Sequence, residues 1–279
     1  MPGEPLNNPL VSCKWLSEHI EDKSLIIVDC RYNLLDKAYG REAYSKGHIP
    51  GAYFLDMEMR LTGNVGKHGG RHPLPEMEEF QESMNNIGLE PGKTVIAYDD
   101  DGSGASRLWW LLKYYGHPDV MILNGGFQEW SDLGLPVSRN MPEPGKGNFK
   151  ARISDHILVN RDDLMKLPHG TKIIDVRDRE RYLGITEPID RIAGHIPGAI
   201  NIPYKDIIEK PGKFRSPEEL EKIFSGSGKE PVVYCGSGIT SCVNFVALES
   251  IGRHPKLYAG SWSDWISYED SEIATGESQ

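Results

Sequence analysis

The sequence has no apolar run close to the length that a membrane helix needs. About 20 consecutive apolar residues are required to cross a bilayer, and no stretch of this 279-residue chain reaches that length. The first residues, MPGEPLNNPLVSCKWL, show neither the apolar core of a secretion signal nor the arginine-rich pattern of a transit peptide. We therefore expect a cytoplasmic protein that does not bind membranes.

Cysteine is scarce, and its spacing excludes two common roles. The chain has 4 cysteines, with no CxxC pair and no Cys/His cluster at zinc-binding distance. A disulfide framework and a structural zinc site both need such patterns. We expect no metal and no organic cofactor. In a reducing compartment the thiols stay free for chemistry.

Positive charge is also in short supply. The chain has 31 Lys and Arg against 41 Asp and Glu, a net charge of −10, and a pI near 5.4. That balance argues against nucleic acid or an anionic membrane as a partner. The 38% hydrophobic and 26% charged content is typical of a globular protein. The length favours two domains.

Four motifs occur twice in the same order, which indicates an internal duplication. They are LIIVDCR (25–31) and KIIDVR (172–177), GHIPGA (47–52 and 194–199), TVIAYDD (94–100) and PVVYCG (231–236), and NGGFQEW (124–130) and AGSWSDW (259–265). In this pairing Asp99 stands where Cys235 stands in the second copy. GHIPGA repeats after 147 residues, but Asp99 and Cys235 are 136 apart. The first copy therefore has eleven extra residues, which we place in the basic, glycine-rich stretch TGNVGKHGGRHPLP.

Each half alternates β-branched runs with helical segments, for which we predict the ranges 77–87, 106–115, 161–167 and 217–224. Such alternation predicts an α/β protein with βαβ units on a parallel sheet. We expect an N-terminal domain over 1–137, a linker over 138–152 and a C-terminal domain over 153–279. The linker is rich in Pro and Gly and has no periodicity. The acidic tail after Ile266 is expected to be poorly ordered.

The stretch PVVYCGSGITSCVNFVALESIG (231–252) predicts a strand, a tight loop and a helix. Cys235 then lies where helix N–H groups and the helix dipole favour the thiolate. Gly236 and Gly238 allow the backbone to approach the sulfur. Further hydroxyl donors come from Ser237, Thr240 and Ser241. The alternative is that Cys235 is a small buried apolar residue, which is what we expect of Cys242.

These motifs resemble those of tandem rhodanese sulfurtransferases, in which only the second domain keeps the active-site cysteine. The resemblance covers about residues 10–266. It implies two tandem rhodanese-like domains, each a mainly parallel sheet flanked by helices, with Cys235 as nucleophile.

The cysteine loop CGSGIT is similar to the 3-mercaptopyruvate type, CGSGVT. Thiosulfate-type loops resemble CRxGx(K/R), and this loop has no Lys or Arg. The resemblance therefore implies 3-mercaptopyruvate as sulfur donor, with Gly236, Gly238 and Ile239 in contact with it.

A carboxylate on the substrate needs a clamp, for which arginine has the right bidentate geometry. The segment RYLGITEPIDR resembles the family's arginine segment before GHIPGA. It offers Arg181 and Arg191, with Arg179 as a competitor to Arg181 if the register shifts. The alternative is that these are solvated surface charges.

The resemblance also assigns first-domain residues to the site. Asp56 or Glu58 matches an acid after GHIPGA, and His72 matches a histidine before Leu-Pro. A surface loop without function is the alternative. Structural roles are expected for two repeated pairs, which are Asp29 with Arg31 and Asp175 with Arg177, and for the two GHIPGA histidines, His48 and His195.

The implied reaction has two steps. Cys235 takes sulfur from 3-mercaptopyruvate to form a persulfide, pyruvate leaves, and Ser237 and Thr240 relay a proton or bind the sulfur. A thiol such as thioredoxin or a low-molecular-weight thiol, or cyanide in an assay, then accepts the outer sulfur. We expect a monomer.

Three other functions require different residues. A cysteine phosphatase needs CxxxxxR, and Ser241 stands at that arginine position. A thiosulfate:cyanide sulfurtransferase remains open, because basic residues outside the loop would supply the missing charge; these are Lys67, His68, Arg71 and His72. A persulfide-carrying or binding module fits the first domain, where Asp99 replaces cysteine, better than the second.

Overall fold

The computed structural model describes residues 8–277 and divides into two compact units. The two units lie in the same chain but exchange short segments. Within the described range, unit 1 contains residues 8–63, 75–154 and 210–214, and unit 2 contains 64–74, 155–209 and 215–277. Residues 1–7, the start of the stretch read for targeting signals, lie outside the described part.

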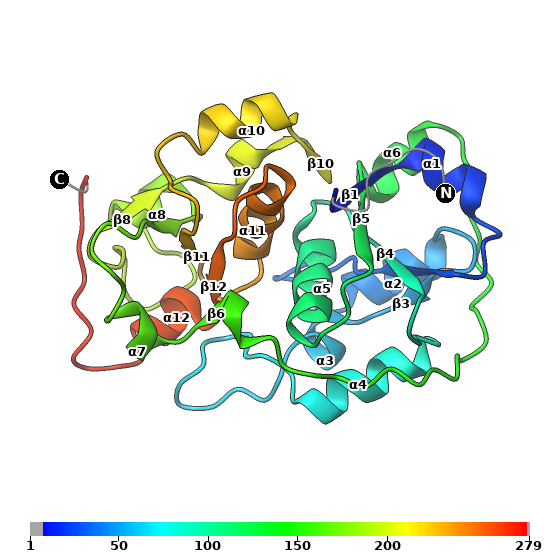
Figure 1. Cartoon of the computed structure of the whole chain (residues 1–279), viewed down its shortest axis with the longest axis horizontal. Coiled ribbons are helices and arrows are strands. Elements are labelled where there is room, and N and C mark those ends of the chain that lie inside the picture. The colour runs from blue at the N-terminus through cyan, green and yellow to red at the C-terminus, as the bar shows by residue number, and fades with distance from the viewer. Residues whose placement is uncertain (1–7, 278–279) are drawn as a thin grey trace. The chain divides into compact units, whose positions relative to one another are not determined.

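Unit 1 is an α/β unit built on a parallel sheet of order β1-β5-β4-β2-β3. Its elements are β1 (Leu10–Ser12), α1 (Cys13–His19), β2 (Leu25–Asp29), α2 (Tyr39–Lys46), β3 (Tyr53–Phe54), α3 (Met57–Arg60), α4 (Met77–Asn86), β4 (Thr94–Tyr98), α5 (Ser103–Tyr114), β5 (Val120–Asn124), α6 (Gly126–Asp132) and the short β10 (Lys213–Phe214). Figure 1 shows α5 alongside β4 and β5, which it contacts.

Unit 2 repeats this arrangement with the parallel order β6-β12-β11-β7-β8. Its elements are a 3-10 turn (Asp155–Ile157), β6 (Leu158–Val159), α7 (Arg161–Leu164), β7 (Ile173–Asp175), α8 (Arg179–Tyr182), β8 (Ala199–Asn201), α9 (Tyr204–Ile207), β9 (Ile208–Lys210), α10 (Pro217–Ile223), β11 (Val232–Tyr234), α11 (Ser241–Ser250), β12 (Lys256–Tyr258) and α12 (Ser261–Trp265). The matching strand orders confirm the predicted α/β class with two similar halves.

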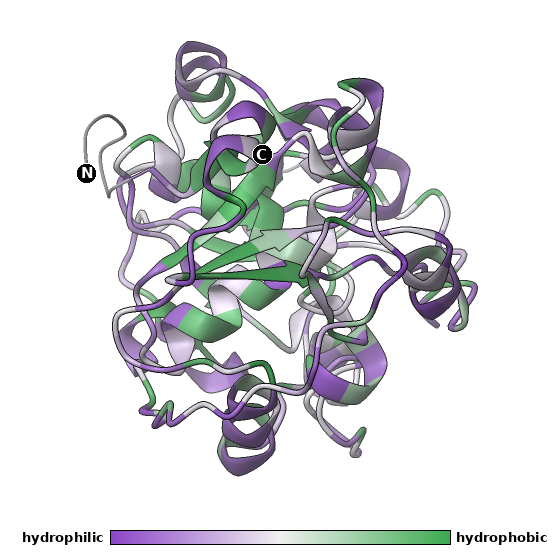
Figure 2. Ribbon diagram, turned by 90° about the vertical axis from the view of Figure 1, so that its right-hand side faces the viewer, coloured by the Kyte–Doolittle hydropathy of each residue, from purple (hydrophilic) through white to green (hydrophobic). Residues whose placement is uncertain are grey.

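The central strands and helices are buried because their sequences are apolar on every side. In β2, four consecutive residues up to Asp29 are buried, and the same holds in β4, as expected for parallel strands covered on both faces. Helix α11 has no residue exposed to solvent in its first two turns, and it contacts β11, β12, α9 and α10. In Figure 2 the strands and the helices next to them are hydrophobic, and the outer helices are hydrophilic.

The predicted helices agree with the structure within a few residues. The range 77–87 corresponds to α4 and 217–224 to α10, where Ser216 and Glu219 form a capping box and Pro217 opens the helix. The range 106–115 begins three residues late relative to α5, and 161–167 ends three residues beyond α7.

The units differ from the domain boundaries expected from the sequence. The stretch 138–152 contains neither helix nor strand and packs on unit 1, where Gly145 donates its N–H to Asn86 and Phe149 is buried. Residues 64–74, inside the basic insertion, belong to unit 2, and residues 210–214 belong to unit 1. The periodicity of the sequence does not predict that either of these two segments belongs to the other unit.

The expectation of a poorly ordered tail is wrong for its described part, 267–277. Ala274 forms an antiparallel bridge with His195. The carbonyl of Glu272 accepts the indole N–H of Trp265 at 2.8 Å, and Asp270 pairs with Arg161 at 2.7 Å. These bonds fix a segment whose composition alone suggests disorder. Residues 278–279 lie outside the described part.

The repeated ion pairs and histidines have the structural roles expected of them. Arg31 pairs with Asp29, and Arg177 with Asp175, each at 2.6 Å and buried. His48 stacks on Tyr44 and His195 on Tyr182, and each histidine Nδ1 bonds the carbonyl of the residue on which it stacks. These contacts brace the ends of β2 and β7.

Over residues 8–277, no helix is both long and apolar enough to cross a membrane.

Candidate active site

Cys235 follows β11 directly and lies at the base of the loop that leads to α11. Its Sγ accepts a hydrogen bond from the N–H of Gly238 at 3.1 Å and from the hydroxyl of Ser241 at 3.4 Å. Gly238 has φ +84°, and a Cβ there would lie 2.1 Å from the carbonyl oxygen of Ala259. Only glycine fits that position, so its N–H remains aimed at the sulfur.

The loop makes Cys235 more acidic than an ordinary thiol. Burial opposes the charged form, but hydrogen bonds from the side chains of Ser241 and Thr240 and from the N–H groups of Ser237 and Ser241 outweigh it. They lower the pKa of Cys235 from 9.0 to about 7. A substantial share of the thiol is therefore ionised at neutral pH. Burial instead raises the pKa of Cys13 and of Cys30.

Ser261 supports Cys235 from the next strand end and was not identified from the sequence. Its Oγ accepts the N–H of Cys235 at 3.1 Å and lies 3.9 Å from Sγ. Among the described non-glycine residues, Ser261 alone has positive φ, at 56°. Gly126, at the matching place in the first copy, has φ 57°. A serine in this conformation is strained, and only its hydroxyl makes the contact with the backbone of Cys235 that glycine would lack.

We expect Ser241→Ala to raise the pKa of Cys235 by about one unit, because it removes a charge-assisted hydrogen bond to the thiolate. The measurement is the rate of Cys235 alkylation by iodoacetamide against pH. In the wild type this rate should rise with pH to a plateau, with its midpoint near pH 7.

The matched control is Ser250→Ala, which removes a serine from the other end of α11, where the hydroxyl bonds Ala247 at 2.7 Å. It should leave the midpoint unchanged. A midpoint that stays the same in Ser241→Ala would show that the hydroxyl does not stabilise the thiolate.

Segment 64–74 brings residues of the first half of the sequence to this loop within unit 2. Asp264 accepts the N–H of Gly69 at 2.7 Å, Ser263 accepts that of Arg71 at 3.1 Å, and His68 stacks on Tyr268. His72 is buried, and its Nδ1 lies 2.8 Å from the hydroxyl of Ser237. The structure thus brings together His72 and Ser237, two residues selected from the sequence.

Arg181 also lies at the loop. Its guanidinium pairs with Glu187 at 2.8 Å and with Asp190 at 3.0 Å. A Cβ placed on Gly236 would be 3.4 Å from Nη2 of Arg181. The guanidinium therefore faces the residue that follows the nucleophile.

Arg71, rather than Arg191, is the second arginine at this point. Its Nη2 would lie 2.9 Å from a Cβ on Gly236, and its Nη1 pairs with Asp190. Burial lowers the pKa of Arg71, while the negative charge of Cys235 acts in the opposite direction. Arg191 instead donates to the carbonyl of Ile266, and Arg179 pairs with Glu277. From the sequence, Arg71 was expected only as one of the basic residues that would supply positive charge for binding thiosulfate.

Asp56 belongs to unit 1. Its carboxylate accepts the N–H groups of Glu58 and Met59 as the N-cap of α3, and it pairs with Arg41 at 3.4 Å. This is a local structural role. Participation of Asp56 in the site stays a prediction.

In unit 1, Asp99 occupies the place of the nucleophile. Its carboxylate accepts N–H groups from Gly102, Gly104 and Ala105 at 2.6 to 3.0 Å. The backbone cradle that surrounds Sγ in unit 2 thus holds a carboxylate here. Burial raises the pKa of Asp99 well above its ordinary range. A carboxyl group cannot carry a persulfide.

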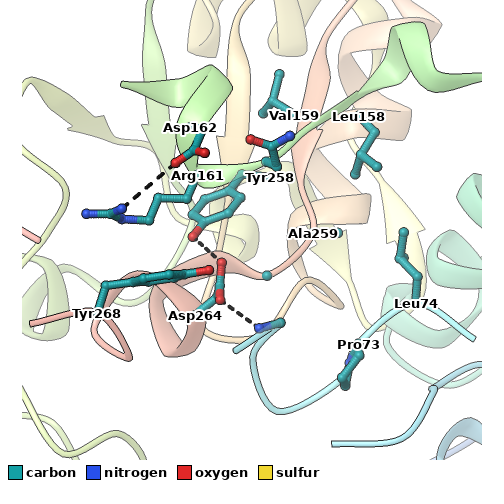
Figure 3. Close-up of a pocket in the computed structure, with 13 residues that line it drawn as sticks. Pro73, Leu74, Leu158, Val159, Arg161, Asp162, Tyr258, Ala259, Asp264 and Tyr268 are labelled. Carbon is teal, nitrogen blue, oxygen red and sulfur yellow. Dashed lines mark hydrogen bonds and ion pairs between the residues drawn. The ribbon is translucent and has the colours of Figure 1, made fainter. Parts of the chain in front are cut away.

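A separate cavity of about 410 Å³ lies in unit 2 beside segment 64–74. Figure 3 shows Tyr258 and Tyr268 on one side, with Pro73 and Leu74 on another. Asp264 accepts the hydroxyl of Tyr258 at 2.6 Å as well as the N–H of Gly69. Cys235 is not among the residues that line this cavity.

Comparison with known proteins agrees with this geometry. The chain matches the rhodanese-like domain family twice, over residues 12–133 and 160–268. It is 38% identical to the "Probable 3-mercaptopyruvate sulfurtransferase" of Pseudomonas aeruginosa, over 96% of this chain and 98% of that protein. It is 32% identical to the thiosulfate sulfurtransferase of Mus musculus, over 95% and 94%.

Among solved structures, SseA from Escherichia coli, described as a 3-mercaptopyruvate sulfotransferase, superposes with a TM-score of 0.81 at 33% identity. The match covers 92% of this chain and 99% of SseA. The family match in both halves and the identity over nearly the whole chain lead to one conclusion: the chain belongs to the rhodanese family, with one rhodanese-like domain in each half.

Proposed function

We propose that the chain transfers sulfur from 3-mercaptopyruvate, through a persulfide on Cys235, to a thiol acceptor. The observation that carries the proposal is the Cys235 loop. It stabilises a thiolate with N–H and hydroxyl donors and has no Lys or Arg of its own. Positive charge lies next to Gly236, on Arg71 and Arg181. This arrangement suits a substrate whose carboxylate lies away from the sulfur that reacts.

In the first step, the Cys235 thiolate attacks the sulfur of 3-mercaptopyruvate. The bond between the two sulfurs forms while the bond between the substrate sulfur and carbon breaks, and pyruvate leaves as its enolate. The enolate must take up a proton, and the hydrogen-bonded pair of His72 and Ser237 is the route we assign to it. Thr240 stabilises the thiolate, and Arg181 holds the substrate carboxylate.

In the second step, the thiolate of an acceptor attacks the outer sulfur and releases Cys235. Loop N–H groups stabilise the persulfide anion in the way an oxyanion hole stabilises oxygen. Thioredoxin and low-molecular-weight thiols are the acceptor classes we propose.

We also propose a monomeric state and a cytoplasmic location. The location is proposed because all four cysteines are free thiols.

Thiosulfate as donor is the second candidate, and Arg71 is the observation that favours it. Its guanidinium brings to Gly236 the positive charge that the loop lacks. A relative of this chain, from Mus musculus, is named for that donor. The persulfide intermediate would be the same.

We expect kcat/KM for 3-mercaptopyruvate to exceed that for thiosulfate by about tenfold or more, because differences of this size separate substrates that a site fits unequally. The test is steady-state transfer from each donor to cyanide under the same conditions. A higher kcat/KM for thiosulfate would assign the second function instead. Transfer from neither donor would leave only a persulfide carrier or a binding module.

A further inference from the structure

We propose that Asp190 determines donor specificity by setting the charge of the anion site beside Cys235. The inference rests on the proposed function and adds a residue that discriminates between donors of different charge. Asp190 is almost fully buried, with 4% of its side chain exposed. One of its carboxylate oxygens bonds Nη1 of Arg71, and the other bonds Nη2 of Arg181 at 3.0 Å.

Asp190, Arg71 and Arg181 meet beside the loop that holds Cys235. From a Cβ placed on Gly236, Nη2 of Arg71 would be 2.9 Å away, Nη2 of Arg181 3.4 Å and Oδ2 of Asp190 3.6 Å. The Nε of Arg71 is buried and has no hydrogen-bond partner. A buried, unsatisfied guanidinium N–H is costly unless a ligand takes it. It is therefore available to an incoming anion.

The charges of the side chains paired around this point cancel. Three arginines, Arg71, Arg177 and Arg181, meet three carboxylates, Asp175, Glu187 and Asp190. Arg177 pairs with Asp175 at 2.6 Å, and Glu187 contacts both Arg177 at 3.2 Å and Arg181 at 2.8 Å. Asp190 is the carboxylate that Arg71 and Arg181 share, so an anion that binds these two arginines lies beside it.

The position of Asp190 between the two arginines affects the binding of the two donors differently. 3-Mercaptopyruvate brings one negative charge, on its carboxylate, to two arginines whose charge Asp190 and Glu187 already reduce. Thiosulfate brings two negative charges on a small ion, and the second meets the Asp190 carboxylate. Repulsion of an unwanted charge is an effective way to gain specificity, and it is strong where the groups are buried. Asp190 therefore disfavours the dianion.

The test is Asp190→Asn, which keeps the size of the side chain and removes its charge. With cyanide as acceptor, kcat/KM for thiosulfate should rise about tenfold, while kcat/KM for 3-mercaptopyruvate should change less than about threefold, because the removed charge opposes the dianion more than the monoanion. The ratio of the two values is the readout, since a general loss of folding would lower both together. An unchanged ratio would overturn the proposal.

Two further variants keep the result interpretable. Asp270→Asn removes an ion-paired carboxylate from the same unit, where it contacts Arg161 at 2.7 Å, and should leave the ratio unchanged. Arg71→Gln should shift the ratio the opposite way, toward 3-mercaptopyruvate. If Asp190→Asn fails to fold, the test rests on Arg71→Gln. An unchanged ratio of the two kcat/KM values in that variant would by itself overturn the proposal. Absence of transfer by the wild type from either donor would instead refute the function on which the proposal rests.

Discussion

Cys235→Ser is expected to reduce sulfur transfer to background, a loss on the order of 10⁴-fold or more in kcat/KM, as seen when a covalent nucleophile is removed. Serine keeps the size and the hydrogen bonds of the loop. Its hydroxyl is not ionised at neutral pH, whereas the pKa of Cys235 is lowered to about 7. The measurement is steady-state transfer from 3-mercaptopyruvate to cyanide.

The control is Cys242→Ser, which changes the other cysteine near the loop. Cys242 is buried, and its Sγ bonds the carbonyl of Gly238 at 3.4 Å. This variant should retain most activity. After incubation with donor alone, mass spectrometry should find one added sulfur atom on wild type and on Cys242→Ser, and none on Cys235→Ser. An added sulfur on Cys235→Ser would place the persulfide elsewhere.

Arg181→Ala is expected to lower kcat/KM for 3-mercaptopyruvate by about 100-fold, mainly through KM, because it removes a charge-assisted contact to the carboxylate. Arg181 points at Gly236 and is 12% exposed. Arg181→Lys should recover only part of the loss, since lysine lacks the planar fork that binds both carboxylate oxygens. Steady-state kinetics over a range of donor concentrations gives kcat and KM separately.

Arg179→Ala is the matched control for register, because Arg179 is two residues away, largely exposed and paired with Glu277. It should leave KM unchanged. Arg191→Ala tests the other arginine expected from the sequence, which here contacts Ile266. A larger rise of KM in either of these variants than in Arg181→Ala would assign the clamp to that residue.

The sequence predicted the architecture well because the duplication is written in local patterns. Apolar runs such as 25–29 and 94–98 became the central parallel strands, and the glycines of the loop at Cys235 marked the turn before α11. Loop hydroxyls and N–H groups follow from position alone, so a lowered pKa for Cys235 was also predictable. These features depend on neighbours in the sequence.

The arrangement of charges was less predictable because it depends on contacts over long sequence distances. Arg71 and Asp190 are separated by 119 positions, and no local pattern indicates that they meet. Ser261 looked like one variable position of a repeated motif, but comparison of the two copies at Gly126 would have singled it out. In the tail, the acidic composition predicted disorder, but contacts such as the ion pair of Arg161 with Asp270 hold the described residues in place.

Segment 64–74 has a consequence for how such a protein can evolve. After a duplication, the copy without its cysteine would be free to degenerate or to be lost. Here that copy encodes Arg71 and His72, which lie at the site of the other copy. Deletion of the inactive half would thus remove part of the working site. Selection can therefore retain the first half although Asp99 has ended its own chemistry.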